Sequence, residues 1–390
     1  MSEQLTFARA DDGLWQQYDE LATRAYGHRV GDITHLRTHA DLQVAVRGGR
    51  VVAGGLGLLV DQFFGGSPVP SACLGDGCVA PEERGEHLAA RMTAARLRPM
   101  VEQGAVISTI STSSTGYARW LGWEAPVPVL AWSVATDDLK KSYTSEDFEI
   151  EHGLNEDAQT LQRDLARQWN GPVLRPAWWP AWKETKNALT TYHFSRPGHP
   201  TSGLLSLATK RHERHGMALT IHEFWAANQE TAAAMLAFLG RHNTRAETID
   251  FRRGALPPYP TLLHNLHRFR PTAESWHPWM LRILDIPEAI RLRGWPAELT
   301  TTVPIEIENA TGDGWSRWMF QVKAGSAEIA PTHIEGQAIF TRRQFAVWYA
   351  GGYRSATSAR MAGVQAVSQI ALTALVRCTG DLEPWLPDHF

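Results

Sequence analysis

The stretch from Cys78 to Met92, CVAPEERGEHLAARM, is the feature that most constrains how this sequence can fold. An apolar run typical of a strand leads into Pro81, a polar loop follows, and a helical pattern of apolar residues begins near Leu88. A strand that leads through a short loop into a helix is typical of α/β units, and such a loop can hold a phosphate at the helix N-terminus. Three interpretations follow: a working cofactor loop, a modified one, or an ordinary turn.

The flanking segments favour an α/β unit around this stretch. Residues 41–63 predict two strands joined by a Gly-Gly-Arg turn, and residues 105–112 predict a further short β-branched strand. Between them, residues 86–103 predict a helix, which Pro99 is expected to kink or to end early.

The remainder of the chain alternates between helices and antiparallel strands. An amphipathic helix is predicted to end at Asn170-Gly171. Later patterns predict strands over 188–195, 202–211, 217–226 and 247–253, a helix over 230–243, strands over 298–309, 315–325 and 337–352, and a last helix over 364–378.

Composition narrows the class of protein. A chain of 390 residues with 43% hydrophobic residues can form two or three domains, each with a core. The sequence has no long apolar run and no leader-like start, so we expect a cytoplasmic protein without membrane spans. Its three cysteines are scattered, and no HExxH or paired His/Cys spacing occurs, so we expect neither a disulfide framework nor a metal site.

Charge is unevenly distributed along the chain. The formal net charge is −3, yet residues 206–293 carry twelve Lys and Arg against eight Asp and Glu, a surplus of four. The basic segments KRHERH (210–215), RHNTR (241–245) and HRFR (267–270) lie there. A solvated face and a binding surface for an anionic partner both fit this surplus.

Several patches resemble one family. VAPEERGEHLAARM, followed by STSSTGYARWLGWE, resembles the cofactor loop and catalytic strand–helix of GNAT acyltransferases. RQWNGPVLRPAWW, LHRFRPTAESWHPWMLRILDIPEAIRLRGW and the terminal CTGDLEPWLPDHF resemble the enhanced intracellular survival (Eis) acetyltransferases. The resemblance implies an α+β and α/β chain, with two GNAT-like domains of mixed sheets and flanking helices over 1–140 and 141–290. It also implies a sterol-carrier-like α+β domain over 291–390 and a homo-oligomer, usually a hexamer.

The resemblance implies a donor loop over residues 79–89 that holds the pyrophosphate of acetyl-CoA or another acyl-CoA on backbone N–H groups. Arg84 and Ala89 fit the family pattern, but His87 stands where glycine is usual and Glu86 stands where a basic residue is common. The Glu86 charge is unfavourable to a phosphate, whereas the His87 side chain would either obstruct the phosphate or, if protonated, donate a hydrogen bond to it. The donor residues expected are Val79, Ala80, Arg84, Gly85, Glu86, His87, Leu88 and Ala89.

The altered loop leaves three possibilities open. The chain uses acyl-CoA, or it uses a different activated donor, or it has lost catalysis and acts as a binding protein. An aminoacyl-tRNA or a carrier-protein thioester would not need the same grip on a pyrophosphate, and the basic middle region suits either of these anionic partners.

Two residues are catalytic candidates by the same resemblance. Tyr117 matches the tyrosine that protonates the departing thiolate; the alternative is a core aromatic beside Trp120 and Trp123. Phe390 is the last residue, and its α-carboxylate matches the terminal base of the family; the alternative is a frayed tail.

Three further residues are candidates for contact with the acceptor, a small-molecule amine. Asp76, between two glycines, is either a pocket residue that pairs with an amine or a turn aspartate. Trp178 and Trp179 are either packing residues or a substrate platform. No Ser, Cys or Lys is arranged as a covalent nucleophile, so we expect direct attack of the amine in a ternary complex.

Overall fold

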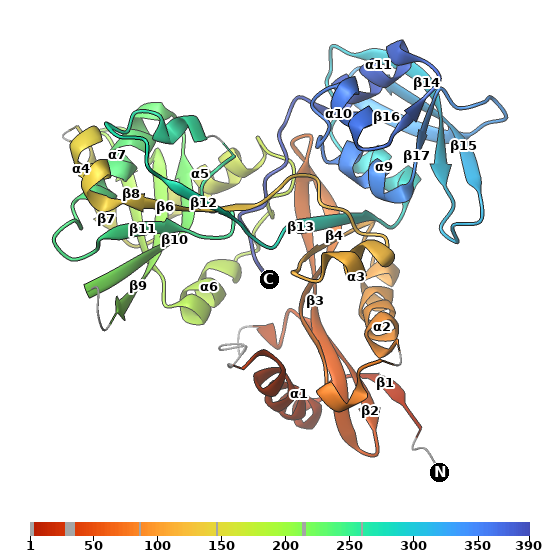
Figure 1. Ribbon diagram of the computed structural model, residues 1–390, viewed down its shortest axis with the longest axis horizontal. Coiled ribbons are helices and arrows are strands. Elements are labelled where there is room, and N and C mark those ends of the chain that lie inside the picture. Colours follow the sequence, from red (N-terminus) through yellow and green to blue (C-terminus); the bar gives the residue numbers. More distant parts are fainter. Residues whose placement is uncertain (1–3, 28–35, 86, 146, 213–215, 259) are drawn as a thin grey trace.

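The computed structural model describes residues 4–27, 36–85, 87–145, 147–212, 216–258 and 260–390. Glu86 and part of the basic segment 210–215 therefore lie outside the described residues. Three β-sheets with flanking helices form three lobes (Figure 1).

The strands are β1 (Thr6–Arg9), β2 (Asp41–Arg47), β3 (Arg50–Phe64), β4 (Ser67–Val79), β5 (Ile107–Ser111), β6 (Leu130–Ala135), β7 (Glu149–His152), β8 (Thr190–Ser195), β9 (Gly203–His212), β10 (Gly216–Ala226), β11 (Thr248–Phe251), β12 (Thr272–Ser275), β13 (Trp279–Ile283), β14 (Thr300–Glu308), β15 (Trp315–Lys323), β16 (Ser326–Pro331), β17 (Ala338–Phe340) and β18 (Gln365–Ala366). The helices are α1 (Asp12–Tyr26), α2 (Leu88–Glu102), α3 (Thr115–Trp120), α4 (Thr136–Ser142), α5 (Glu156–Ala166), α6 (Trp179–Asn187), α7 (Gln229–Gly240), α8 (Ile286–Leu292), α9 (Arg342–Tyr349), α10 (Ala356–Met361) and α11 (Gln369–Thr379). Short 3₁₀ turns occur at Pro81–Glu83 and Pro260–Leu263.

The first sheet has the order β1-β2-β3-β4-β5-β13. The predicted hairpin is confirmed: β2 and β3 are joined through Gly48 and Gly49, whose φ angles of 55° and 73° favour glycine. The predicted helix is also confirmed as α2, which retains Pro99 in its last turn and ends at Glu102. The expected early end at Pro99 does not occur, because the helix continues through the proline to Glu102, and the proline removes only its own N–H donor.

The second sheet has the order β12-β6-β11-β10-β9-β8-β7, and the two sheets exchange strands. β6 follows the first lobe in sequence but pairs with β11 of the second sheet. β13 follows the second lobe but returns to pair with β5 of the first. These two exchanged strands tie the lobes together (Figure 1).

The third sheet has the order β16-β15-β14-β17-β18 and packs against α8, α9 and α11. The expectation of a strand over 337–352 is wrong for most of its length, because only β17 is extended there. Thr341 begins α9 with a capping box, in which its hydroxyl and the Gln344 amide bond each other's backbone N–H groups. The apolar residues that follow suit a buried helix as well as a strand, and the cap decides between them.

One buried side chain joins all three lobes. The Asn170 amide accepts a hydrogen bond from the Gly65 N–H at 2.7 Å and donates to the carbonyls of Ala350 and Leu382 at 3.0 and 2.8 Å. From this junction the C-terminal segment runs back between the first two lobes, where the chain ends (Figure 1). Among the helices described, none is long and apolar enough to cross a bilayer.

Candidate active site

The cleft of the first sheet arises where two parallel strands separate. β4 pairs with β5 only from Ser71 to Leu74, opposite Ile107 to Ile110. The register between β3 and β4 shifts just beyond, between Gly54 and Leu56, and Asp76 there has a φ of 46°. The splayed strands open into a cleft of about 950 Å³ that is also lined by α3, α6, β10 and the C-terminus.

Side chains from two helices hold the backbone of this bulge. The buried Arg96 of α2 donates to the Gly75 carbonyl, and the Tyr18 and Tyr26 hydroxyls donate to the carbonyls of Asp76 and Gly77 at 2.5 and 2.6 Å. Burial raises the pKa of Tyr18 and lowers the pKa of Arg96. The charge of the nearby Tyr18 offsets part of the shift of Arg96. The Asp76 carboxylate faces the cleft and lies 3.6 Å from Lys186 Nζ.

The donor loop connects the bulge to α2. Arg84, Val79 and Ala89 line the cleft, whereas Ala80 and Leu88 are buried in the core. His87 precedes the helix in the left-handed region, with a φ of 54°, and its ring lies 5.9 Å from that of Trp120. The backbone thus keeps a conformation that favours glycine, although the residue is histidine. Gly85 also has a positive φ, 104°, and Glu86 is outside the described residues.

Tyr117 lies at the wall of the cleft on α3. Its side chain is partly exposed, whereas Trp123 is fully buried and Trp120 is 63% exposed. Burial raises the pKa of Tyr117, and a hydrogen bond with Thr93 of α2 lowers it in part. The phenol is therefore protonated at neutral pH and can donate a proton into the cleft.

Phe390 also lies in the cleft, with its carboxyl group against the bulge of β4. A Cβ placed on Gly75 would lie 2.7 Å from the carboxyl carbon of Phe390 and 2.8 Å from a carboxyl oxygen. Only a residue without a side chain leaves this space for the chain end. Gly75 is therefore part of the position in which the chain end docks, whereas a side chain on Gly77 would meet Arg96.

A buried ionic network fixes the segment that precedes Phe390. Asp388 is 2% exposed and accepts from the Val173 N–H at 2.9 Å. Arg175 donates to Asp388 at 2.9 Å through Nε and lies 2.9 Å from Glu223 through its terminal nitrogen. Burial by itself would lower the pKa of Arg175, but the two carboxylates raise it above its ordinary value.

The second lobe has a splay of its own, and the tail fills it. β10 and β11 pair in parallel only over Leu219–Ile221 and Ile249–Phe251. Beyond that point, Trp385 Nε1 donates to the Gly254 carbonyl at 2.6 Å, and the His389 ring bonds the Arg253 carbonyl at 3.0 Å. The tail therefore occupies the splay of the second sheet, whereas the splay of the first sheet stays open.

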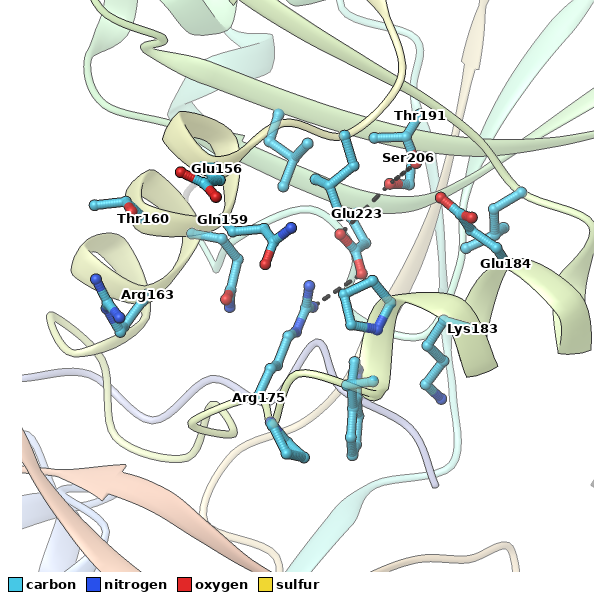
Figure 2. A pocket seen from close by; sticks show the side chains of 17 residues that line it. Glu156, Gln159, Thr160, Arg163, Arg175, Lys183, Glu184, Thr191, Ser206 and Glu223 are labelled. Carbon is cyan, nitrogen blue, oxygen red and sulfur yellow. Dashed lines mark hydrogen bonds and ion pairs between the residues drawn. The ribbon is translucent and has the colours of Figure 1, made fainter. Parts of the chain in front are cut away.

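A smaller cavity of about 280 Å³ lies behind the tail, between α5, α6 and the second sheet. Figure 2 shows Glu223 at its centre, bonded to Arg175 and to Ser206. Trp179 lines both this cavity and the main cleft, whereas Trp178 stacks on His39 with ring centroids 4.5 Å apart and lines neither.

Sequence reasoning missed several residues that shape the cleft: Gly75, Arg96, Arg175, Lys183, Arg253 and Asp388. Arg96 had a readable signal, because it stands between Met92 and Met100 at helical spacing on the buried face of α2. The other contacts join segments far apart in the chain, such as Val173 and Asp388, and no local pattern reports them.

Comparisons with known proteins agree with this architecture. Family models of the acetyltransferase (GNAT) domain match residues 6–125 and 171–283, together more than half of the chain. A model of the sterol carrier protein domain matches residues 286–387. A search of curated proteins finds no match.

Solved structures resemble the chain over its whole length. A GCN5-related N-acetyltransferase from Anabaena variabilis is 21% identical with a TM-score of 0.87, over 99% of this chain and 100% of that one. One from Kribbella flavida is 21% identical, with a TM-score of 0.78 over 100% and 99%. Eis1 from Mycobacterium abscessus is 15% identical, with a TM-score of 0.74 over 99% and 100%.

At these identities the similarity to the solved structures shows a shared fold, and the family models show the family membership. The expected fold class is confirmed, with two mixed α+β domains and a third α+β domain. The chain belongs to the GNAT acetyltransferases and consists of two GNAT domains followed by a sterol carrier protein domain.

Proposed function

We propose that the protein is an N-acyltransferase that moves an acyl group from an acyl-CoA to an amine of a small molecule. Donor and acceptor meet in the cleft between the first two domains, with the donor in the splay of β4 and β5. Tyr117 acts as the general acid and the terminal carboxylate of Phe390 as the base.

The reaction is a direct displacement. The carboxylate of Phe390 accepts a proton from the amine, the nitrogen attacks the thioester carbonyl, and the carbon–sulfur bond breaks. The departing thiolate takes the proton of Tyr117, and the proton on the carboxylate later returns to the phenolate through solvent. The products are an amide and free CoA thiol, and no acyl-enzyme is formed.

The observation that carries this proposal is the position of the chain end. The Phe390 carboxyl group lies against Gly75 in the same cleft that Tyr117, Asp76 and Arg84 line. A frayed tail would not have a buried Asp388 that pairs with Arg175, which in turn pairs with Glu223.

The test is amine-dependent acyl transfer by the full-length, untagged chain. The protein is incubated with acetyl-CoA and a panel of primary amines. The release of free thiol is followed, and the masses of the products are measured by mass spectrometry. Thiol release that requires the amine, with one acetyl group added to it, is expected. Absence of transfer from acetyl-CoA and from longer acyl-CoA donors would exclude the CoA reaction.

One observation favours a second donor class. His87 stands at the start of α2, with the ring of Trp120 from α3 beside it, where a pyrophosphate would need close contact with the backbone. An aminoacyl-tRNA or carrier-protein thioester avoids that requirement. Transfer from a charged tRNA or an acyl carrier protein, with none from acyl-CoA, would select this alternative; binding without any transfer would indicate a binding protein.

A further inference from the structure

The second domain contributes a basic wall to the main cleft. This basic wall consists of Lys183 of α6, His222 of β10, Arg253 just beyond β11, and His389 of the tail, all of which line the cleft. His222 stands at a register shift of β10, between Ile221 and Glu223, so its side chain is presented outside the regular ladder.

Among the described residues, every side-chain carboxylate that lines the cleft lies near a cation. Asp76 lies 3.6 Å from Lys186, and Glu223 and Asp388 lie 2.9 and 2.8 Å from Arg175. Each of these three carboxylates is therefore close to a cation outside the wall, and their charges raise the pKa values of Lys183 and Arg253 only in part.

Two basic side chains of the wall, Lys183 and Arg253, have no ion-pair partner among the described residues, and burial lowers the pKa of Lys183 well below its ordinary value. Lys183 Nζ donates to the His389 carbonyl and lies 4.0 Å from the centroid of the Trp182 ring. The Arg253 guanidinium lies 5.9 Å from the centroid of the Trp276 ring, and no carboxylate in the described structure lies within ion-pair distance of it. Arg253 also has a φ of 56°, which is unfavourable for a residue with a side chain.

The pKa values of the two histidines in the wall are lowered by burial and by nearby positive charge. Burial and then the charges of Arg253 and Lys183 lower the pKa of His222 to about 4. The same causes lower the pKa of His389 well below its ordinary value. Burial is the larger cause and would disfavour a bound anion as well, whereas the charges of Arg253 and Lys183 favour one.

We propose that the basic wall binds an anionic group of the acceptor, so that the acceptor is an amine that also carries a carboxylate or phosphate group. The Arg253 guanidinium pairs with the anion, and the amine end lies toward the carboxylate of Phe390. This inference rests on the proposed function, because it assigns one side of the same cleft to the acceptor.

The experiment compares amines that differ only at the far end: aminobutyrate, diaminobutane and aminobutanol. Each is assayed for kcat/KM in acyl transfer and for equilibrium binding by calorimetry, which needs no turnover. The unmodified protein should favour the carboxylate over both others by about tenfold, a difference of about 1.4 kcal/mol. Arg253→Gly, which suits the positive φ, should remove that preference, and Arg253→Lys should keep part of it.

Arg252→Ala is the matched control, because Arg252 is adjacent and exposed but does not line the cleft. It should preserve the preference for the carboxylate. No such preference in the unmodified protein, whether from equal binding or from none, would overturn the inference. An Arg253→Gly change that raises only the KM of the donor would also overturn it, since the wall would then serve the donor's phosphates.

The two proposals fail in different ways. Transfer to amines without any preference for an anion would leave the proposed function intact and refute the basic wall. A calorimetric preference for the carboxylate that depends on Arg253, without transfer from any donor, would support the wall and refute the enzyme.

Discussion

The carboxyl group of Phe390 occupies the space that a side chain on Gly75 would fill, since a Cβ there would lie 2.7 Å from the carboxyl carbon. These residues are far apart in the sequence, yet their contact brings the chain end to the strand bulge beside the splay of β4 and β5. The first prediction tests this relationship directly.

Gly75→Ala should displace the terminal carboxylate and lower kcat by about a hundredfold, the usual contribution of a positioned base. The φ of Gly75 is not in the left-handed region, so the fold should accept alanine. Gly13→Ala on α1, where a Cβ makes only an ordinary 3.6 Å contact, is the control. Steady-state kinetics and thermal unfolding are compared, and full activity of Gly75→Ala would refute the role of the chain end.

Tyr117→Phe should lower kcat by roughly tenfold to a thousandfold and leave donor affinity little changed, because it removes only the phenolic proton. Turnover is measured with acetyl-CoA and a good acceptor, and donor affinity is measured by calorimetry. Unchanged turnover would remove Tyr117 from the mechanism.

Asp388→Asn should weaken the anchorage of the tail. It leaves Arg175 with one carboxylate instead of two, and loss of a buried ion-pair partner costs about 3 kcal/mol or more. We expect a lower melting temperature together with a fall in kcat that exceeds any change in KM. Glu288→Gln, which breaks an exposed pair with Arg291 on α8, is the control and should change neither. Activity equal to that of the unmodified protein would show that the anchor is dispensable.

His87→Gly together with Glu86→Arg should raise affinity for acetyl-CoA by one to two orders of magnitude if the loop is a weakened CoA site, since about 1.4 kcal/mol is tenfold. The glycine also suits the φ of 54° at this position. Calorimetric titration of both proteins with acetyl-CoA decides the point. Little CoA binding by the double variant, with loss of the native reaction, would indicate a different donor.

His222 should make stability depend on pH in a defined window. Its pKa is about 4 in the folded protein and near 6.5 when unfolded, so the unfolded chain binds more protons between these values. Stability is therefore unaffected above about pH 6.5 and falls as the pH drops toward 4, by at most about 3 kcal/mol. Denaturant unfolding of His222→Gln should show a smaller loss over this window, and an identical pH profile would contradict the assignment.

Much of the fold could be predicted from local sequence. The strand, loop and helix from β4 to α2 could be predicted, because the spacing of apolar residues and the effects of proline and glycine are local. The prediction for segment 337–352 was wrong because its apolar run fits both a strand and a helix. The helix is selected by the Thr341 cap, which depends on one reciprocal pair of hydrogen bonds. The domain boundaries at 140 and 290 remain a prediction, and the exchange of β6 and β13 lies beyond any local pattern.

The site divides along the same line. The sequence offered Tyr117, the donor loop and Phe390 as candidates through the resemblance of short local motifs to the GNAT and Eis acetyltransferases, and their roles stay predictions. Only the tertiary structure decided that the tail fills the splay of the second domain and leaves that of the first open. Only it brought Arg253, Lys183 and His222 to one wall. Their proximity depends on packing between segments that are distant in sequence. The burial of apolar surface brings such segments together, but it produces no periodic pattern within any single segment that would predict the contact.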